Sequence, residues 1–254
     1  MKYTYGTSIA AARRLEDISA FFNPAATTFI RRHLNGPVDC VLDIGCGPGF
    51  STDMLLRAIS CSRAFGLDNS DFFIQLAKNR FPYCWFIEHN ILYTPFPVSA
   101  DVMYTRFVLS HLAEPVDRVN RWVEQLPPNG LFFIDELEAI DTDIAVFKRY
   151  LEINTGLVRS QGAELFVGQI LADGRYGAEV LCNESARLPV ENARAAGWFL
   201  PNTLTIWEDG PYVKDNVSEA ERKEIADELA RIKSSGDTRR QIIWTMRRMV
   251  LRRY

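Results

Sequence analysis

Hydrophobic residues follow two patterns in the first half of the chain: short runs in which they predominate, and positions at helical spacing. Mostly apolar runs of this length predict strands that are covered on both faces, as in parallel sheets. The runs cover residues 38–44, 64–68, 85–88, 100–104 and 131–135. Helical spacing between them predicts helices at about 50–60, 70–80 and 115–126. Because strands and helices alternate, we expect a doubly wound, mostly parallel α/β sheet.

The first 36 residues follow the helical pattern. Residues 8–34 carry apolar side chains, among them Phe21 and Phe22, at near-helical spacing and predict helix. Pro24 is expected to divide this segment into two helices, because proline has no amide hydrogen to donate to the preceding turn.

The second half of the chain departs from the strand–helix alternation. Residues 139–184 predict a helical cap over the carboxyl edge of the sheet, since they are too long for a simple crossover. A helix is then expected to end at Gly197, followed by a strand at about 203–208 and a charged helix at 218–233. Residues 241–253 fit helix and strand about equally, and we expect a last, antiparallel strand there, in a sheet of about seven strands.

Composition narrows the possible functions. A net charge of −3 over 254 residues argues against non-specific electrostatic binding of nucleic acid. The five cysteines form no Cys-x-x-Cys pair and the three histidines show no ligand spacing, so neither a disulfide framework nor a metal site is expected. No apolar run approaches the roughly 18–20 residues of a membrane span, and the start lacks a signal-peptide pattern. We therefore expect a cytoplasmic protein.

Basic residues concentrate near the end of the sequence, where residues 239–254 contain arginines but neither Asp nor Glu. A segment of this kind forms a solvated face or a strand edge, or alternatively an anion-binding patch. The arginines are Arg239, Arg240, Arg247, Arg248, Arg252 and Arg253.

A glycine-rich turn follows the first predicted strand, in Asp43-Ile44-Gly45-Cys46-Gly47-Pro48-Gly49. Glycines at the carboxyl edge of a strand permit positive φ and let a ligand approach the backbone. A nicotinamide loop has the pattern G-x-G-x-x-G, whereas the third glycine here comes one position early. Asp43 precedes the turn, and a buried carboxylate would oppose a pyrophosphate but suit a cationic ligand. S-adenosylmethionine, with its sulfonium and ammonium groups, meets that requirement.

A second carboxylate stands at the end of the second predicted strand. Asp68 lies where a ribose would lie, and a carboxylate accepts hydrogen bonds from both ribose hydroxyls. An Asp that ends a strand is by itself often a turn or cap residue; its pairing with the Asp43 turn favours the ribose role.

These motifs carry a resemblance to a known family. Residues 38–137 resemble a class I S-adenosylmethionine-dependent methyltransferase, close to the type 11/UbiE-like small-molecule group. Val41 to Gly49 resembles the family's first motif at every position, and Asp68-Asn69-Ser70 resembles its acidic second motif. The resemblance implies a Rossmann-like core at 37–138, between an N-terminal helical lid (1–36) and a helical cap (139–190), with residues 191–254 completing the core sheet.

The third and fourth motifs match less closely. Asn90, in His89-Asn90-Ile91, stands where the family usually has Asp, and its amide can still accept from the adenine amine and donate to a ring nitrogen. Residues 101–112 resemble the family's fourth strand and the loop beyond it. The resemblance thus implies this cofactor-binding set: Asp43, Gly45, Cys46, Gly47, Asp68, Asn69, Asn90, Ile91, Thr105, Arg106 and Phe107.

The N-terminal segment resembles the lid helix that precedes the first strand in many of these enzymes. Tyr3, Tyr5 and Arg14 are then expected to close over the methionine end of the cofactor or over the substrate. The alternative is that they are surface residues of a capping helix.

Methyl transfer is an in-line displacement on a carbon that the cofactor already activates, so no catalytic triad is required. His111 is the candidate base, since the resemblance places it near the methyl group. Alternatively, His111 has only a structural role and packs among apolar residues.

The predicted cap contains several aromatic residues, which belong either to the hydrophobic core or to an apolar acceptor pocket: Phe147, Tyr150, Phe166 and Tyr176.

We therefore expect a methyltransferase that acts on oxygen, nitrogen or carbon of a small molecule, as a monomer or a homodimer, without nucleic acid or membrane as partner. Non-methylating pericyclic or elimination chemistry on the same fold is the main alternative, and a non-catalytic module that binds the cofactor is a further one. Methylation of nucleic acid or protein fits less well, because residues 105–108 contain neither an Asn/Asp-Pro-Pro-Tyr/Phe sequence nor a Pro-Cys nucleophile.

Overall fold

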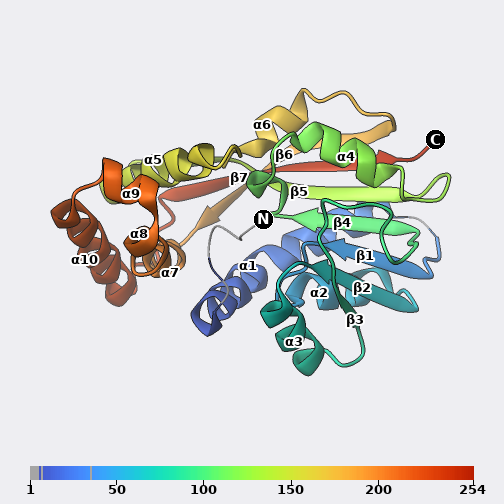
Figure 1. Cartoon of the computed structure of the whole chain (residues 1–254), viewed down its shortest axis with the longest axis horizontal. Coiled ribbons are helices and arrows are strands. Elements are labelled where there is room, and N and C mark those ends of the chain that lie inside the picture. Colours follow the sequence, from blue (N-terminus) through green and yellow to red (C-terminus); the bar gives the residue numbers. More distant parts are fainter. Residues whose placement is uncertain (1–5, 7, 35) are drawn as a thin grey trace.

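The computed structural model describes residue 6 and residues 8–34 and 36–254 (Figure 1). In this part of the chain a seven-stranded sheet has the order β3-β2-β1-β4-β5-β7-β6. The strands are β1 (Cys40–Ile44), β2 (Arg63–Asp68), β3 (Trp85–Glu88), β4 (Val102–Arg106), β5 (Leu131–Thr142), β6 (Glu179–Val190) and β7 (Ile242–Arg252).

The five predicted parallel strands are confirmed. β1 pairs in parallel with β2 and β4, and the parallel set continues to β3 on one side and β5 on the other. Every residue of β1 and β4 is buried, which explains why apolar residues predominate in these strands. The expected doubly wound, mostly parallel sheet is therefore present.

Helices cover both faces of this sheet (Figure 1). The helices are α1 (Ile9–His33), α2 (Phe50–Ile59), α3 (Asp71–Arg80), α4 (Pro115–Val123), α5 (Ala145–Ser160), α6 (Val167–Ala172), α7 (Asn192–Thr203), α8 (Ile206–Asp209), α9 (Pro211–Asn216) and α10 (Glu219–Ser235), with the 3-10 turn η1 (Leu109–His111). Leu42 and Ile44 pack towards α4 and α6, whereas Val41 packs towards α1, α2 and α3. The alternation of side chains along β1 thus builds two separate cores.

The last two strands run antiparallel. β7 pairs with β5 from Leu131↔Arg252 to Thr142↔Ile242, so the expectation of a final antiparallel strand is confirmed. β6 pairs with the other side of β7 and forms the edge of the sheet. The prediction of a helical cap over 139–184 was wrong at both ends, because residues 139–142 extend β5 and residues 179–184 begin β6. The edge strand alternates between exposed and half-buried side chains, a pattern with too few apolar positions to predict a strand.

The prediction that Pro24 divides the first helix was wrong. α1 is continuous over 25 residues, and Pro24 lies on its exposed side. The opposite side buries Phe22, Ala26 and Phe29 against the rest of the protein. Because that packing holds both halves of the helix in place, the loss of one backbone hydrogen bond does not break it.

The elements predicted at Gly197 and at 203–208 were also wrong. α7 continues through Gly197 to Thr203, since Ala196 and Trp198 on either side of the glycine are buried. The short helix α8 takes the place of the expected strand, and its Trp207 is fully buried. Tertiary packing of these aromatic residues decides the local structure here.

A helical lobe stands beyond the ends of the long antiparallel strands. α5, α7, α8, α9 and α10 gather there, away from β1, β2 and β3 (Figure 1). α10 packs on α7, and α5 packs on α9. α1 runs between the two parts and contacts both α2 and α7.

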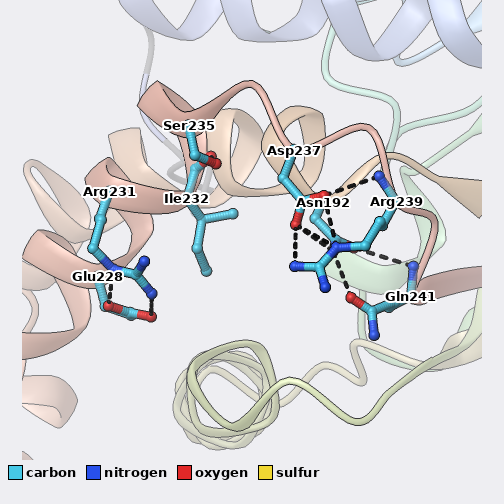
Figure 2. Close-up of polar contacts among 8 residues, drawn as sticks. All are labelled: Asn192, Glu228, Arg231, Ile232, Ser235, Asp237, Arg239 and Gln241. Atoms are coloured by element: carbon cyan, nitrogen blue, oxygen red, sulfur yellow. Dashed lines mark hydrogen bonds and ion pairs between the residues drawn. The ribbon is translucent and has the colours of Figure 1, made fainter.

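Asn192 fixes the chain where it returns from this lobe into β7. Its side-chain Nδ2 donates to Asp237 Oδ2 (3.0 Å) and Gln241 Oε1 (2.9 Å). Its Oδ1 accepts from the backbone N–H of Gln241 (3.1 Å). Arg239 also donates to Asp237 (Figure 2) and is the main cause of the lowered pKa of that carboxyl. Since Asn192 is fully buried, these bonds anchor the start of β7.

Arg247, Arg248 and Arg252 lie on β7, inside the sheet between β5 and β6, whereas Arg239 and Arg240 precede this strand and are exposed. Arg248 is buried and pairs with Asp135 of β5 at 3.2 Å. Arg247 pairs with Glu138 of β5 at 2.7 Å, and Arg252 pairs with Glu179 of β6. Cross-strand carboxylates therefore compensate the basic side chains of this strand.

Candidate functional site

The glycine-rich turn connects β1 to α2 at the carboxyl edge of the sheet. Gly45, Gly47 and Gly49 all have positive φ, of 73°, 52° and 87°. The Gly45 amide donates to Leu67 O of β2 (2.8 Å), which holds the turn close to the neighbouring strand. A Cβ at Gly45 would lie 2.4 Å from Val108 Cγ2. Both the backbone conformation and the space thus require glycine at this position.

Asp43 lies beneath the turn rather than in the wall of a cavity. Its carboxyl is 1% exposed, and Oδ2 accepts from Ser51 Oγ (2.6 Å) and Thr52 Oγ1 (2.7 Å), both in the first turn of α2. Burial raises its pKa to about 6, against the opposing effect of those two hydrogen bonds. The group is therefore mainly ionised at neutral pH, and it places a negative charge under the turn.

Asp68 links the end of β2 to the same turn. Its Oδ2 accepts from the Gly47 amide and its Oδ1 from the Ser70 amide, each at 2.9 Å. Burial is the main cause of its raised pKa. Each carboxylate oxygen has two lone pairs, so Asp68 keeps acceptor capacity towards the space it borders.

A cavity of about 1000 Å³ opens above the turn, and we refer to it as the first cavity. Eight residues of the expected cofactor-binding set border it besides Asp68: Gly45, Cys46, Gly47, Asn69, Asn90, Ile91, Arg106 and Phe107. Asn90 Oδ1 accepts from the Leu92 amide at 3.1 Å, which fixes the side chain at the rim. The structure thus brings together residues from four separate segments, and their contacts with a cofactor stay predictions.

The two residues before Phe107 have other contacts. Thr105 is fully buried, and its hydroxyl donates to Ile44 O at 3.2 Å, so it does not border the first cavity. Arg106 borders the cavity, but its guanidinium donates to Asn23 Oδ1 of α1 at 2.8 Å. Arg106 therefore ties the end of β4 to the N-terminal helix.

Phe107 occupies a strained turn after β4. Its φ is +57°, a left-handed conformation that is uncommon for a bulky residue. The amides of Val108 and Leu109 donate to one oxygen, Glu136 Oε1, at 2.8 and 3.0 Å. Glu136 is fully buried on β5, and burial raises its pKa to about 7. Sequence reasoning missed Glu136, although a carboxylate within the apolar run of β5 is a visible anomaly.

A second cavity, of about 690 Å³, lies between α1 and the helical lobe. It shares four wall residues with the first cavity, namely Leu15, Ile18, Phe107 and His111. Its wall also includes Tyr150 and Leu151 from the predicted cap, whereas Phe147 is fully buried and packs on Phe199. Phe166 packs against the hydrophobic core that contains Phe147. Tyr176 packs against the core beneath α4 and α6, and its hydroxyl donates to Leu171 O (2.7 Å). The two cavities adjoin at the turn after β4.

His111 is the candidate base, and it lies at this junction. Burial first, and then the nearby Arg14, lower its pKa to about 4. The imidazole is therefore neutral at neutral pH.

Arg14 reaches the second cavity from α1 and is 8% exposed. It donates to Asn202 Oδ1, and Asn202 Nδ2 donates to Tyr150 Oη at 2.5 Å. Neither Asn202 nor its position on α7 was predicted from the sequence. Tyr3 and Tyr5, the other expected lid residues, lie outside the described residues.

Aromatic side chains line one part of the second cavity, beside aliphatic and polar residues. Tyr150 stacks on Phe199 with ring centroids 4.2 Å apart, and Phe199 stacks in turn on Trp244. Trp198 meets Trp244 edge to face at 5.5 Å. These side chains come from α5, α7 and β7, so only the folded chain assembles them.

Fold and site together define an α/β domain of the class I S-adenosylmethionine-dependent methyltransferase type, with the glycine turn and acidic second strand of that class. Residues 42–134 match the model of the type 11 methyltransferase domain family. These residues are similar to the methyltransferase domains of that family, and S-adenosylmethionine is the cofactor of the class.

Similar proteins agree with this assignment. A trans-aconitate 2-methyltransferase from Rhodopseudomonas palustris is 33% identical over 109 residues, which are 43% of this chain and 43% of that protein. The chain thus spans less than half the length of this relative in the match. The YcgJ protein from Bacillus subtilis has the same fold, with a TM-score of 0.56, 15% identity, and coverage of 90% of this chain and 97% of that chain. The (4+2)-cyclase SpnF also shares it, with a TM-score of 0.50, 16% identity, and coverage of 90% and 79%.

Within the described part of the chain, no helix has both the length and the apolar character needed to cross a membrane. The same residues contain no group of three or more His, Cys, Asp or Glu side chains placed to hold a metal ion.

Proposed function

We propose that this protein transfers a methyl group from S-adenosylmethionine to a small-molecule acceptor and releases S-adenosylhomocysteine. The shared wall of Leu15, Ile18, Phe107 and His111 carries the proposal. A cofactor in the first cavity and an acceptor in the second meet at this wall. Binding both partners next to each other and away from water is what an in-line transfer requires of the protein.

The groups around the first cavity fit the cofactor. Asp68 has acceptor capacity left for the ribose hydroxyls beyond its bonds to the turn. Gly47 has open space where a Cβ would stand, with Leu15 Cδ1 the nearest atom at 3.9 Å, so its backbone is open to close approach. Asn90 offers an amide to the adenine edge, and Ile91 offers an apolar surface to its face. The charge of Asp43 beneath the turn favours a cationic ligand.

S-adenosylmethionine supplies, when bound, a methyl group that is already activated as a leaving electrophile. The residues of this chain then orient the acceptor and exclude water. Phe107 separates the cavities at the transfer point, held there by Glu136 through the two amides that follow it. His111 faces the same point as a neutral imidazole, and its lowered pKa makes it a weak base. Its role as general base stays a prediction.

The acceptor is a small molecule in this proposal. The second cavity, whose empty volume of about 690 Å³ includes space open to solvent, is bounded by side chains of α1, α5, α7 and β7 and suits a small molecule rather than a polymer. The name of the Rhodopseudomonas relative supports an acceptor of that size class. Nucleic acid is a poor candidate, because the arginines of β7 are already paired with carboxylates. A cytoplasmic location and a homodimer stay predictions.

Non-methylating chemistry is the second candidate function, since the fold also serves a (4+2)-cyclase. The two candidates differ in what happens to the cofactor. Methyl transfer consumes it and forms S-adenosylhomocysteine in equal amount to the product, whereas a cyclase leaves it intact.

The test is to incubate the protein with S-adenosylmethionine and a panel of carboxylic acids, phenols and amines, and to follow S-adenosylhomocysteine by mass spectrometry. We expect acceptor-dependent S-adenosylhomocysteine, and strongly reduced formation by Asp68→Ala at limiting S-adenosylmethionine. Tight cofactor binding with no S-adenosylhomocysteine from any acceptor class would favour the second candidate.

A further inference from the structure

Asn154 and Trp244, in the wall of the second cavity, each have a buried polar atom without a hydrogen-bond partner among the described residues. The atoms are Oδ1 of Asn154, on α5, and Nε1 of Trp244, on β7. Both residues border the second cavity, and they are 1% and 7% exposed. Buried polar groups in folded proteins are almost always hydrogen-bonded, so these two atoms indicate partners from outside the chain.

The orientation of the Asn154 amide follows from the bond that its nitrogen makes. Nδ2 donates to Tyr150 O, one turn earlier on α5, at 2.9 Å. A backbone carbonyl only accepts, so the nitrogen must face it and the oxygen must be the other end. Burial raises the pKa of Tyr150 to about 12, and hydrogen bonds donated by Asn202 and Asn154 oppose this shift, which again places the Asn154 nitrogen beside Tyr150. Since an amide oxygen only accepts, the partner that Oδ1 lacks is a hydroxyl or N–H group.

Trp244 lacks the opposite kind of partner. An indole nitrogen only donates, so its partner must be an oxygen or nitrogen with a lone pair. The Trp244 ring meets Phe107 edge to face with centroids 6.2 Å apart, and Phe107 belongs to the wall that both cavities share. Trp244 therefore stands next to the junction of the two cavities.

Two neighbouring side chains of the same kinds are satisfied within the protein. Trp198 borders the second cavity and meets Trp244 edge to face, but its Nε1 donates to Asp17 Oδ2 at 2.6 Å. Asn202 uses both ends of its amide, because Oδ1 accepts from Arg14 and Nδ2 donates to Tyr150 Oη. The described wall thus contains one amide and one indole with protein partners, and one of each with a polar atom left over.

We infer that Asn154 and Trp244 select the acceptor: it carries a hydroxyl or N–H group that donates to Asn154 Oδ1, and a carbonyl oxygen that accepts from Trp244 Nε1. This inference rests on the proposed methyl transfer, which assigns the second cavity to the acceptor. The rings of Tyr150, Phe199 and Trp244 contact the apolar body of such a molecule. An analogue without either polar group leaves a buried protein atom unpaired, so the site discriminates against it.

Phenolic ketones test the two hydrogen bonds separately. The probes are meta- and para-hydroxyacetophenone, their methoxy analogues, which lack the donor, and meta- and para-ethylphenol, which lack the carbonyl. Affinities are measured by calorimetry on the full chain in the presence of S-adenosylhomocysteine, so no turnover is needed. We expect wild type to bind at least one hydroxyacetophenone about tenfold more tightly than the methoxy and ethyl analogues of the same substitution pattern.

Asn154→Leu tests the bond to the hydroxyl group. Leucine has nearly the shape of asparagine but cannot accept, so the preference for hydroxyl over methoxy should disappear. Asn216→Leu is the matched control, because Asn216 is exposed on α9 and makes the same intrahelical bond, from Nδ2 to Tyr212 O at 2.8 Å. This control should keep the wild-type preference. A hydroxyl preference that persists in Asn154→Leu would overturn the role of Asn154.

Trp244→Phe tests the bond to the carbonyl group, with Trp198→Phe as its matched control. Both changes shrink an aromatic ring in the wall and remove an indole N–H, but the Trp198 N–H is already bound to Asp17. The preference for ketone over ethyl should disappear in Trp244→Phe and remain in Trp198→Phe. Because the readout is a ratio of affinities, a general loosening of the wall does not imitate this result. Equal loss in both variants would overturn the role of Trp244.

Failure of every probe to bind, or equal affinities of the three kinds of probe for wild type, would also overturn the inference. A failure of the proposed function has a different signature. The expected affinity ratios without S-adenosylhomocysteine from any acceptor would support the roles of Asn154 and Trp244 and contradict methyl transfer. Turnover as fast with acceptors that lack either polar group as with those that carry both would leave methyl transfer standing and overturn the inference.

Discussion

Glu136 Oε1 lies 2.8 Å from the Val108 amide nitrogen, and the whole Glu136 side chain is buried. This bond joins β5 to the turn that follows β4. Because the same oxygen accepts from Leu109, one carboxyl group fixes the two residues after Phe107 and holds Phe107 at its positive φ. The wall between the two cavities thus depends on a residue that borders neither of them.

The raised pKa of Glu136 predicts a pH-dependent stability. The pKa of Glu136 is about 7 in the folded protein, above its ordinary value of 4.5. The stability that the neutral carboxyl group contributes is therefore complete below about pH 4.5 and is lost as the pH rises through 7. Glu136→Gln keeps an acceptor for both amides and cannot ionise. We expect this variant to exceed wild type in stability at pH 8, by up to about 3 kcal/mol, and to approach it at pH 5. Urea unfolding at both pH values measures the difference.

The control for this experiment is Glu224→Gln, which removes an exposed carboxylate from α10. It should show the same change in stability from pH 5 to pH 8 as wild type. A Glu136→Gln variant that keeps the full wild-type pH dependence would show that Glu136 ionises normally.

Asp68 is predicted to bind the cofactor ribose. Asp68→Ala should weaken S-adenosylmethionine binding by roughly 1.5–3 kcal/mol, because two charge-assisted hydrogen bonds are lost. Asp71→Asn is the matched control, since Asp71 lies three residues further on, exposed and bonded to Gln75 within α3. Calorimetric titration of both variants distinguishes the loss of ribose contacts from a general effect of removing a nearby carboxylate. Unchanged affinity in Asp68→Ala would rule out the ribose assignment.

The charge of Asp43 predicts that cofactor affinity depends on pH. Burial raises its pKa from 3.8 to about 6, and a cationic ligand favours the ionised form, so affinity should rise with pH up to about 7. From pH 7.5 down to pH 5, S-adenosylmethionine binding is expected to weaken about tenfold. Asp43→Asn keeps an acceptor for Ser51 and Thr52, and it should bind more weakly at pH 7.5 with a much smaller change at pH 5. An unaltered pH profile in this variant would remove Asp43 from cofactor binding.

Gly45 is predicted to tolerate no side chain. Gly45→Ala combines an unfavourable φ with a Cβ only 2.4 Å from Val108 Cγ2, whereas Gly162 has a similar φ of 78° and nothing within 4 Å. Gly45→Ala should therefore destabilise the protein by about 1–3 kcal/mol more than Gly162→Ala. A double-mutant cycle with Val108→Ala checks the cause, since the clash requires a favourable coupling between the two substitutions. Additive effects would exclude that contact as the reason.

Sequence patterns were sufficient for the parallel half of the fold. β1 and β4 are buried along their whole length, so their apolar runs contain the information that defines them. β6 was missed because its side chains alternate between exposed and half-buried, and the strand exists by pairing with β7. α8 forms where a strand was expected because Trp207 is buried within the lobe. In both places distant parts of the chain decide the local structure.

Sequence motifs likewise predicted one part of the candidate site and missed another. Asp68, Asn90 and the glycine turn were placed from local motifs, and they border the first cavity as expected. Asn202 and Trp244 of the second cavity come from α7 and β7, far from any motif, and only the folded lobe brings them to Arg14 and Phe107. The burial of Asp43 beneath the turn, away from the cavity wall, also required the structure.

Transfer of a deuterated methyl group tests the central proposal most directly. The protein is incubated with S-adenosylmethionine labelled as CD₃ and with a panel of carboxylic acids, phenols and amines, and both products are followed by mass spectrometry. The account predicts equal amounts of S-adenosylhomocysteine and of an acceptor that has gained one CD₃ group, with much less of both formed by Asp68→Ala at limiting S-adenosylmethionine. Intact S-adenosylmethionine after incubation with the full panel would contradict methyl transfer as the function of this protein.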